Sequence, residues 1–286
     1  MVAAALEQAH GWAPGSLAIQ PVKTSGDRIQ DRPLAEVGGK ALWTKELDLA
    51  LLAGETDCSV HSMKDVESER PESLSIAAML ARADVRDRLI GANSIDDLRQ
   101  GAVVGTSSPR RTAQLKRLRL DLRLVSIRGN VDTRLSKLAS GEVDATLLAA
   151  AGLDRLGRPD VGVPIDTSLM LPAPAQGAIG IECRSDDAMT SALISAIDDA
   201  ATHAAVLAER AFTRALGGTC HSPVAALAAV EGDEIAFSGE ILSADGRDRL
   251  TAEARFPVGD DGTPTDLAHH LIGEAPESIR TLFVRG

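Results

Sequence analysis

The chain has 286 residues, which is enough for more than one folded domain. Its formal net charge of -11 and its 2% aromatic content argue against a nucleic-acid surface, which needs cations for phosphates and rings for base stacking. No apolar run approaches the ~18 residues of a membrane span, and the first residues lack the basic region of a signal peptide. Three cysteines without metal-ligand spacing fit free thiols in a reducing compartment, so we expect a cytoplasmic protein.

The beginning of the chain reads as a helix over residues 1–10 and a strand over 16–22, where apolar and polar residues alternate. A second helix is predicted over about 41–53, because leucines recur at helical spacing and Gly54 can end it. Just before this helix, Gly38-Gly39-Lys40 can offer backbone N–H groups and an ammonium to an anion. A tight turn explains the same glycines equally well.

A short apolar strand at Cys58–His61 runs directly into the polar turn Ser62-Met63-Lys64-Asp65. The turn places a cation and a carboxylate at the carboxyl edge of a strand, where open α/β sheets form their ligand crevice. For these two residues alone, an exposed Lys–Asp pair of little energetic weight is the simpler interpretation. The features that follow favour the ligand site.

The next block alternates strands and helices, after a charged, loop-like stretch at 84–100 that ends in a short helix. Strands are predicted at residues 102–105, 123–127 and 143–149. Helices begin after Ser108 and Asn130, which are good N-cap residues, and Pro109 suits the first helical position. This alternation predicts a parallel sheet, so the turns after its first two strands meet at one edge.

That edge is unusually basic for an acidic protein. Between Arg110 and Lys137 lie nine Lys or Arg residues and two acidic residues. The helix dipole disfavours a cation in a first helical turn unless an anion lies in front of it. We therefore predict a carboxylate-binding site at the junction arginines, Arg110, Arg111, Arg128 and Arg134, and at the nearby hydroxyls of Thr106, Ser107 and Ser108. A solvated basic face is the alternative, and we expect it for Lys116, Arg117 and Arg119.

A proline-rich crossing and a strand fill residues 171–184, which is typical of a return between lobes. A helix over about 200–216 follows. Hairpin turns at 231–233 and 245–246 and a final helix from about 265 then indicate a small α+β domain.

The three cysteines differ in their expected surroundings. Cys220 lies on a Gly-flanked loop, where a thiol is reachable, whereas Cys58 and Cys183 lie inside apolar strands. We expect the latter two to be unreactive core residues.

Seven stretches, in order along nearly the whole chain, carry a resemblance to a known family. They are Val37–Lys40, His61–Val66, Gly105–Arg111, Arg128–Leu135, Ala149–Gly157, Gln176–Glu182 and Gly217–Cys220. Together they resemble porphobilinogen deaminase, also called hydroxymethylbilane synthase, although each stretch alone has low specificity.

The resemblance implies an α/β fold of two periplasmic-binding-protein-like lobes, with mixed, mainly parallel sheets, and a small α+β C-terminal domain. The expected divisions are 1–80 with 176–196 for the lobe of the catalytic Asp, 81–175 for the Arg-rich anion-binding lobe, and 197–286 for the domain of the cofactor cysteine. The chain crosses between the lobes twice in this arrangement, and a monomer is expected.

The resemblance also implies the reaction. Four porphobilinogen molecules would be joined into the linear tetrapyrrole hydroxymethylbilane, with release of ammonia, in tetrapyrrole and heme biosynthesis. The implied cofactor is a dipyrromethane, built from the substrate and held by a thioether to Cys220, and the implied catalytic residue is Asp65. The implied cofactor- and substrate-binding residues, with no metal among their ligands, are Lys40, Ser62, Lys64, Thr106, Ser107, Ser108, Arg110, Arg111, Arg128, Gly129, Arg134, Arg155 and Gln176.

Two alternatives remain open at this point. A non-catalytic binder of anionic solutes on the same scaffold explains a basic cleft, but neither Asp65 beside it nor Cys220. An inactive, N-terminally truncated paralogue is the other, because the family has a strand and a Thr-Arg-x-Ser-x-Leu-Ala segment before its first helix, whereas Met1 falls inside that helix. We expect Met1 to be an internal methionine, and this form to be less stable and weak or inactive.

Overall fold

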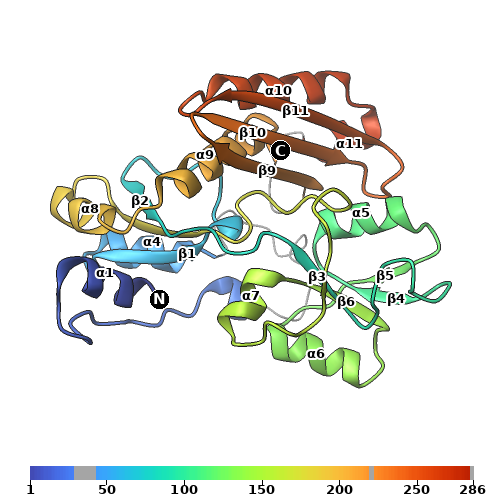
Figure 1. The fold of residues 1–286 in the computed structure, drawn as a ribbon, viewed down its shortest axis with the longest axis horizontal. Coiled ribbons are helices and arrows are strands. Elements are labelled where there is room, and N and C mark those ends of the chain that lie inside the picture. The colour runs from blue at the N-terminus through green and yellow to red at the C-terminus, as the bar shows by residue number, and fades with distance from the viewer. Residues whose placement is uncertain (29–42, 219–221, 284–286) are drawn as a thin grey trace.

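The structure is a computed structural model that describes residues 1–28, 43–218 and 222–283. Three β-sheets with surrounding helices make up two lobes and a C-terminal domain, which meet near the centre of the molecule (Figure 1). The predicted α/β class, with two lobes, mixed sheets and a small α+β domain, is confirmed.

The first lobe is built on a three-stranded sheet in the order β1-β8-β2. Its strands are β1 (Cys58–Ser62), β2 (Leu74–Met79) and β8 (Ile179–Arg184), and its helices are α1 (Val2–His10), α2 (Ser25–Arg28), α4 (Lys45–Leu52) and α8 (Ala188–Ser195). The central β8 is antiparallel to both neighbours. The chain therefore returns to this lobe after it has built the second one, as the proline-rich crossing predicted.

The predicted strand at residues 16–22 is wrong. This segment has no regular secondary structure, and the side chain of Ile19 is 78% exposed. A strand needs a partner for its backbone hydrogen bonds. None of the strands in the described ranges pairs with this segment, so alternation of apolar residues was not sufficient.

The second lobe contains a five-stranded sheet in the order β5-β4-β6-β3-β7. Its strands are β3 (Asp87–Ile90), β4 (Val103–Gly105), β5 (Arg123–Val125), β6 (Ala145–Ala149) and β7 (Val163–Pro164). The predicted parallel pairing holds for β4 with β5 and with β6, whereas β3 is antiparallel to β6 and β7. The expectation of mainly parallel sheets is thus too strong, because parallel pairs occur among the described strands only around β4.

Two helices of the second lobe begin where their capping residues predicted, namely α5 (Pro109–Leu118) and α6 (Val131–Ala139). The lobe also contains α7 (Ala150–Arg155), whose start has no side-chain cap. The side chain of Ser108 accepts a hydrogen bond from the backbone N–H of Arg111, and that of Asn130 accepts one from Thr133. Each cap satisfies a backbone donor that a helix start otherwise leaves unpaired. The first helical turns are therefore held in place at the edge of the sheet.

Strand β3 corrects the prediction of a loop and a short helix over residues 84–100. All four residues of β3 are buried, and no helix lies in this range. The charges of Asp87 and Arg88 made the segment look exposed. Both charges are buried because both are paired, Asp87 with Arg110 and Arg111, and Arg88 with Asp154.

The C-terminal domain has an antiparallel sheet in the order β11-β10-β9, with long helices on one face (Figure 1). Its elements are α9 (Ala200–Ala215), β9 (Val224–Glu231), β10 (Glu234–Leu242), β11 (Arg249–Pro257), α10 (Gly262–Glu274) and α11 (Glu277–Arg280). The hairpins at 231–233 and 245–246 are confirmed. Phe212 of α9 packs edge-on against Phe237 of β10, with 5.2 Å between ring centroids, at the centre of this core. None of the helices described is long and apolar enough to cross a bilayer.

A buried carboxylate joins the C-terminal domain to both crossings between the lobes. The side chain of Glu209 on α9 is 0% exposed and forms a bidentate ion pair with Arg82, with N–O distances of 2.7 and 2.9 Å. Arg82 lies on the first crossing, between β2 and β3. The same carboxylate accepts hydrogen bonds from the backbone N–H of Ala175 on the second crossing and of Ala228 on β9. Four separate parts of the chain therefore depend on one side chain.

We predict that Glu209→Ala strongly destabilises the protein. The change leaves the Arg82 guanidinium and two backbone N–H groups without their buried acceptor, and breaking such a pair typically costs about 3–5 kcal/mol. The measurement is the free energy of unfolding in denaturant. Glu253→Ala, at an exposed position on β11, is the matched control and should stay within about 0.5 kcal/mol of the parent. Equal stability of the two variants would contradict the role given to Glu209.

Candidate active site

Asp65 lies on a single turn of 3-10 helix, Met63–Asp65, directly after β1. Met63 anchors this turn, because its side chain is 1% exposed and its backbone N–H donates to Ala178 on the second crossing. The side chains of Lys64 and Asp65 point outward to solvent. The turn is thus fixed by a buried residue and presents a cation and a carboxylate, as the sequence predicted.

A second buried carboxylate, Glu182 on β8, holds the chain on both sides of this turn. It accepts a hydrogen bond from His61 before the turn at 3.0 Å and two from Arg70 after it, each at 2.8 Å. Burial alone would raise the pKa of Glu182, but the hydrogen bonds from His61 and Arg70 outweigh this effect and lower it to about 2. The position of Asp65 therefore depends on a carboxylate more than a hundred residues away in sequence.

Asp87 on β3 plays the corresponding part in the second lobe. Its carboxylate accepts hydrogen bonds from Arg110 at 2.8 Å, from Arg111 at 2.7 Å and from the Gln176 side chain at 2.9 Å. Burial opposes the ionisation of Asp87, but the charges and hydrogen bonds of the two arginines outweigh it and hold the pKa of this carboxyl well below its usual range. Two of the predicted anion-binding arginines are therefore already paired inside the protein.

The pairing does not use all the donors of these arginines. Arg110 also donates to Gln114 and to the carbonyl of Leu171, and Arg111 donates to the carbonyl of Leu147. The Nε atoms of Arg110 and Arg111 are nevertheless buried without a hydrogen-bond partner. One carboxylate for two guanidinium groups also leaves one positive charge in excess.

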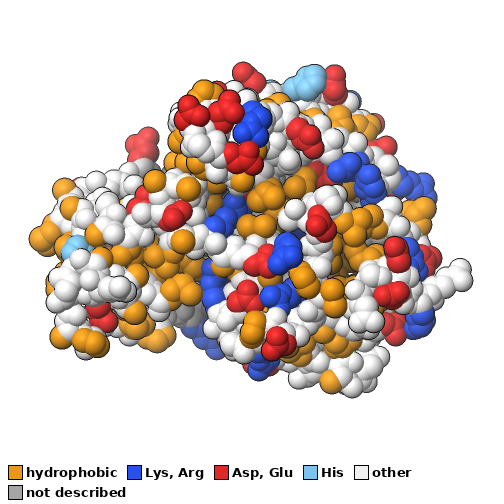
Figure 2. All heavy atoms as spheres, viewed as in Figure 1, with side chains coloured by type: hydrophobic (Ala, Val, Ile, Leu, Met, Phe, Trp, Pro, Cys, Tyr) orange, Lys and Arg blue, Asp and Glu red, His pale blue; other side chains and the backbone are white. Residues whose placement is uncertain are grey.

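Charged groups from both lobes come together around Asp65. The pKa of Arg134 is lowered to about 10, mainly by loss of hydration and further by the charges of Arg111 and Arg128. The negative charge of Asp65 raises this pKa and so opposes the change. The coupling of Asp65 with Arg134 requires Asp65 of the first lobe to lie near this junction arginine of the second. Figure 2 shows Lys and Arg side chains gathered along the boundary between the two lobes, in the middle of the view.

Lys64 belongs to the same group. It is exposed to solvent, yet protein atoms surround it closely enough to weaken its hydration, which is the condition of a side chain in a concave cleft. Loss of hydration lowers its pKa; Asp65 and Asp87 oppose the change, whereas Arg111 and Arg110 add to it. Excess positive charge at this boundary favours an anion with several carboxylates.

Two further predicted residues lie on the second crossing or against it. The amide of Gln176 is 1% exposed and donates to the carbonyl of Val85 as well as to Asp87. Arg155 is exposed, and it donates to the carbonyl of Gly177 at 2.7 Å. Gln176 therefore supports the Asp87 cluster from inside, whereas Arg155 remains at the surface of the crossing.

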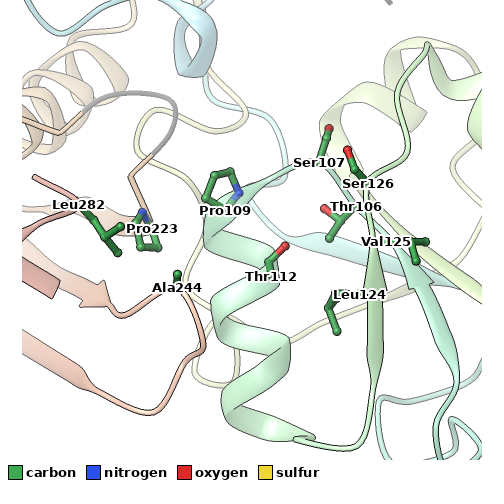
Figure 3. Close-up of a pocket in the computed structure, with 10 residues that line it drawn as sticks. All are labelled: Thr106, Ser107, Pro109, Thr112, Leu124, Val125, Ser126, Pro223, Ala244 and Leu282. Carbon is green, nitrogen blue, oxygen red and sulfur yellow. The ribbon is translucent and has the colours of Figure 1, made fainter. Parts of the chain in front are cut away.

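The predicted hydroxyl residues lie where β4 meets α5. The side chain of Thr106 accepts a hydrogen bond from the backbone N–H of Ser108 at 3.2 Å, and that of Ser108 accepts one from Arg111. Both hydroxyl oxygens therefore stabilise the turn itself. A pocket of about 280 Å³ opens here, lined by Thr106, Ser107, Pro109, Thr112, Leu124, Val125, Ser126, Pro223, Ala244 and Leu282. Figure 3 shows Thr106, Ser107 and Ser126 on one side, with the residues of the C-terminal domain on the other.

Gly129 and Ser62 complete the predicted set within the described ranges. Gly129 has φ +112°, and a Cβ there would lie 2.6 Å from Thr133, so this turn requires glycine. Its carbonyl accepts a hydrogen bond from Nε of Arg134, which aims that side chain. Ser62 lines a smaller pocket of about 150 Å³ beside Asp65 and Trp43. The predicted residues Lys40 and Cys220 lie outside the described residues.

The basic face predicted along α5 differs from expectation at two positions, Arg119 and Lys116. Arg119 is not a solvated cation, since it donates to the carbonyls of Ile95 and Leu98 and pairs with Asp121. Lys116 donates to the carbonyl of Leu122. Both close the far end of α5, which is why they take no part in the candidate site.

Sequence reasoning missed the two carboxylates that hold the site, Asp87 and Glu182. A signal for Glu182 existed, because a lone carboxylate inside the apolar strand Ile179–Arg184 needs a buried partner. Asp87 lies within a charged stretch of sequence, and only the two apolar residues after Arg88 indicate a strand there.

Comparisons with known proteins show the family of the chain. Residues 1–192 match the family model "Porphobilinogen deaminase, dipyromethane cofactor binding domain", and residues 203–271 match "Porphobilinogen deaminase, C-terminal domain". The chain belongs to the porphobilinogen deaminase family. A curated porphobilinogen deaminase of Sphingopyxis alaskensis is 58% identical over 99% of this chain and 91% of its own length, and one of Paracoccus denitrificans is 50% identical over 95% and 88%.

Solved structures give weaker matches. The periplasmic VFT2 domain of BvgS from Bordetella pertussis has a TM-score of 0.37 and 18% identity, over 68% of this chain and 76% of that one. An ancestral arginine-binding protein bound to arginine has a TM-score of 0.37 and 15% identity over the same shares.

The family's dipyrromethane cofactor fits the residues present. Among the described residues, the buried Nε atoms of Arg110 and Arg111 lack partners, and Arg134 faces the like charges of Arg111 and Arg128. No three His, Cys, Asp or Glu side chains gather as metal ligands within the described ranges. An organic group with carboxylate side chains matches this donor set.

We predict that Asp87→Asn destabilises the protein by roughly the 3–5 kcal/mol of a broken buried ion pair, because two guanidinium groups are then buried with no counter-charge. Folding lowers the pKa of Asp87. The ionised carboxylate therefore contributes its full stabilisation above the pKa of the unfolded state, about 3.9, and this stabilisation is lost as the pH falls below that value. The variant should therefore lose less stability than the parent between about pH 5 and pH 3.

Thermal unfolding as a function of pH measures both effects. Asp84→Asn is the matched control, because Asp84 pairs with Arg86 at the surface in the same segment, and such pairs contribute about 0–1 kcal/mol. Parallel pH profiles for the Asp87 variant and the parent would show that Asp87 does not hold the arginine pair.

Proposed function

We propose that this chain joins four porphobilinogen molecules into the linear tetrapyrrole hydroxymethylbilane, releasing ammonia at each condensation, in tetrapyrrole and heme biosynthesis. It would thus act as a deaminating transferase, a hydroxymethylbilane synthase. The observation that carries the proposal is Asp65, a fixed carboxylate at the centre of a cluster of cations contributed by both lobes.

Asp65 is the proposed catalytic residue. A carboxylate held on a rigid turn can accept hydrogen bonds from pyrrole N–H groups. It also stabilises the positive charge that develops on the substrate as ammonia leaves, and a preorganised charge of this kind requires no rearrangement during the reaction. The buried anchor Met63 and the Glu182 hydrogen bonds on either side of the turn provide that rigidity.

The cations are proposed to bind the acetate and propionate side chains of the pyrroles. Lys64 and Arg134 are both coupled to Asp65, Arg128 lies near Arg134, and Arg111 adds the excess charge of the Asp87 cluster. Arginine suits this role because its planar group binds a carboxylate with two parallel hydrogen bonds. The remaining proposed contacts are Lys40, Ser62, Thr106, Ser107, Ser108, Arg110, Gly129, Arg155 and Gln176.

Cys220 is the proposed attachment point of the cofactor, through a thioether. When bound, the dipyrromethane supplies the pyrrole end to which the first substrate is joined. The protein's own residues hold its carboxylates at the lobe boundary, beside Asp65. Pro223, which lines the same pocket as Thr106, comes three residues after Cys220 in the sequence. This proximity is consistent with the proposed placement of the cofactor.

Three domains are proposed, with boundaries 1–80 and 176–196, 81–175, and 197–286. The pairing of β8 with β1 and β2 supports the discontinuous first domain, and the five-stranded sheet supports the second. A monomer in the cytoplasm completes the proposal, since both lobes of the site come from one chain and Cys58 and Cys183 are free thiols.

We predict that Cys220→Ser yields protein whose intact mass equals that of its sequence. The parent should be heavier by one dipyrromethane, because the thioether adds the whole group. A mutant that still carries the adduct would place the attachment at Cys58 or Cys183, and Cys58→Ser is the matched control that should keep the adduct. A parent without any adduct would favour a non-catalytic solute binder or an inactive paralogue.

We predict that Asp65→Ala lowers turnover by at least the ~10²–10⁴-fold typical of a general acid–base group, while the cofactor stays attached. The measurement is the rate of hydroxymethylbilane formation, together with intact mass. Asp57→Ala removes an exposed carboxylate at the other end of β1 and should leave the rate unchanged. Turnover of the Asp65 variant at the parent rate would remove this residue from the mechanism.

A further inference from the structure

Two cysteines that are 125 positions apart in the sequence lie directly opposite each other in the first sheet. Cys58 on β1 is in register with Cys183 on β8 in an antiparallel pair. Both are free thiols. Neither belongs to the site described above, and nothing in the proposed reaction uses them.

The hydrogen-bond pattern places this pair where side chains approach most closely. The register of β1 and β8 ends at Ser62 opposite Ile179. One residue further on, the backbone N–H of Met63 donates to the carbonyl of Ala178, so the ladder continues there as a hydrogen-bonded pair. Hydrogen-bonded and non-hydrogen-bonded pairs alternate along an antiparallel ladder. Counting back from Met63, Cys58 and Cys183 therefore form a non-hydrogen-bonded pair, whose Cα atoms are typically about 4.5 Å apart.

This spacing is compatible with a disulfide, which needs Cα atoms about 4.4–6.8 Å apart. Both side chains also point to the same face, because both pack in one apolar cluster with Ile181 and Ile194. Cys183 is buried and Cys58 is partly exposed, so a small oxidant can reach one thiol while the other lies directly behind it. Burial is also the main cause that raises the pKa of each thiol, which slows oxidation at neutral pH.

We propose that Cys58 and Cys183 form a reversible cross-strand disulfide on reaction with a low-molecular-weight disulfide such as oxidised glutathione. The thiolate of Cys58 attacks one sulfur of the oxidant and displaces the first small thiolate. The thiolate of Cys183 then attacks the sulfur of Cys58 and displaces the second. Two protons and two electrons pass from the protein to the oxidant, which leaves as two thiols.

Such a bond links the strand that leads into the Asp65 turn with the strand that follows the second crossing. Opposed Cβ atoms in a sheet usually lie about 4.5–5.5 Å apart, slightly more than the 3.5–4.5 Å of a relaxed disulfide. A non-hydrogen-bonded pair lies at the short end of this range, so the strands need to approach each other only slightly. The small strain that this leaves makes the bond easier to reduce than a relaxed structural disulfide.

The test exposes the full-length protein to oxidised glutathione, blocks the remaining thiols with an alkylating reagent and maps the digest by mass spectrometry. The expected product is a peptide pair joined through Cys58 and Cys183, lighter by two hydrogen atoms than the free pair and lost on treatment with a mild dithiol. Diamide, a small oxidant, is used in parallel so that slow access of glutathione does not decide the result.

The matched control moves one thiol by a single position. In the double variant Cys58→Ser with Ser59→Cys, the thiol shifts to the opposite face of β1 and lies opposite Glu182, so the joined peptide should disappear although the number of cysteines is unchanged. Full alkylation of Cys58 and Cys183 after both oxidants, or an equal yield of joined peptide from the double variant, would overturn the proposal.

Discussion

Asp87 keeps two arginines side by side in the interior, where without a counter-charge they would repel each other and lose their hydration. Its carboxylate also binds Gln176 of the second crossing, so one ion cluster connects β3, the start of α5 and the return to the first lobe. The connection continues through Gln114 of α5 to Glu240 of β10 in the C-terminal domain. The shape of the lobe boundary depends on this cluster, because it sets where the first turn of α5 lies.

Two other buried carboxylates act in the same way at other places. Glu182 fixes the chain on both sides of the Asp65 turn, and Glu209 joins the C-terminal domain to both crossings. Each is almost fully buried, and each pairs with an arginine that is distant in sequence. Buried ion pairs add little net stability compared with apolar packing, but breaking one is costly, so they select a single arrangement of the parts. In this protein that arrangement brings Asp65 to the arginines.

The division between internal and exposed charge supports the proposed binding of a polyanion. Arg110 is largely satisfied inside the protein, whereas Lys64 and Arg134 retain weakened hydration and face like charges at the lobe boundary. An anion placed there regains hydrogen bonds and relieves the repulsion. The internal carboxylates therefore serve the site indirectly, by holding cations in positions that they would otherwise avoid. The family's dipyrromethane cofactor and this arrangement both fit a ligand with several carboxylates.

The sequence by itself determined the features that depend on neighbouring residues. The caps Ser108 and Asn130, the hairpin turns of the C-terminal domain and the junction arginines were all predicted correctly in position, because each arises within a few residues of chain. Only the tertiary structure decided the pairings between distant segments. It buried the charged strand β3, left residues 16–22 unpaired and set Cys58 opposite Cys183. Strand register and the pairing of buried charges depend on residues that are far away in the sequence. A local sequence pattern contains no information about which distant residue will be the partner.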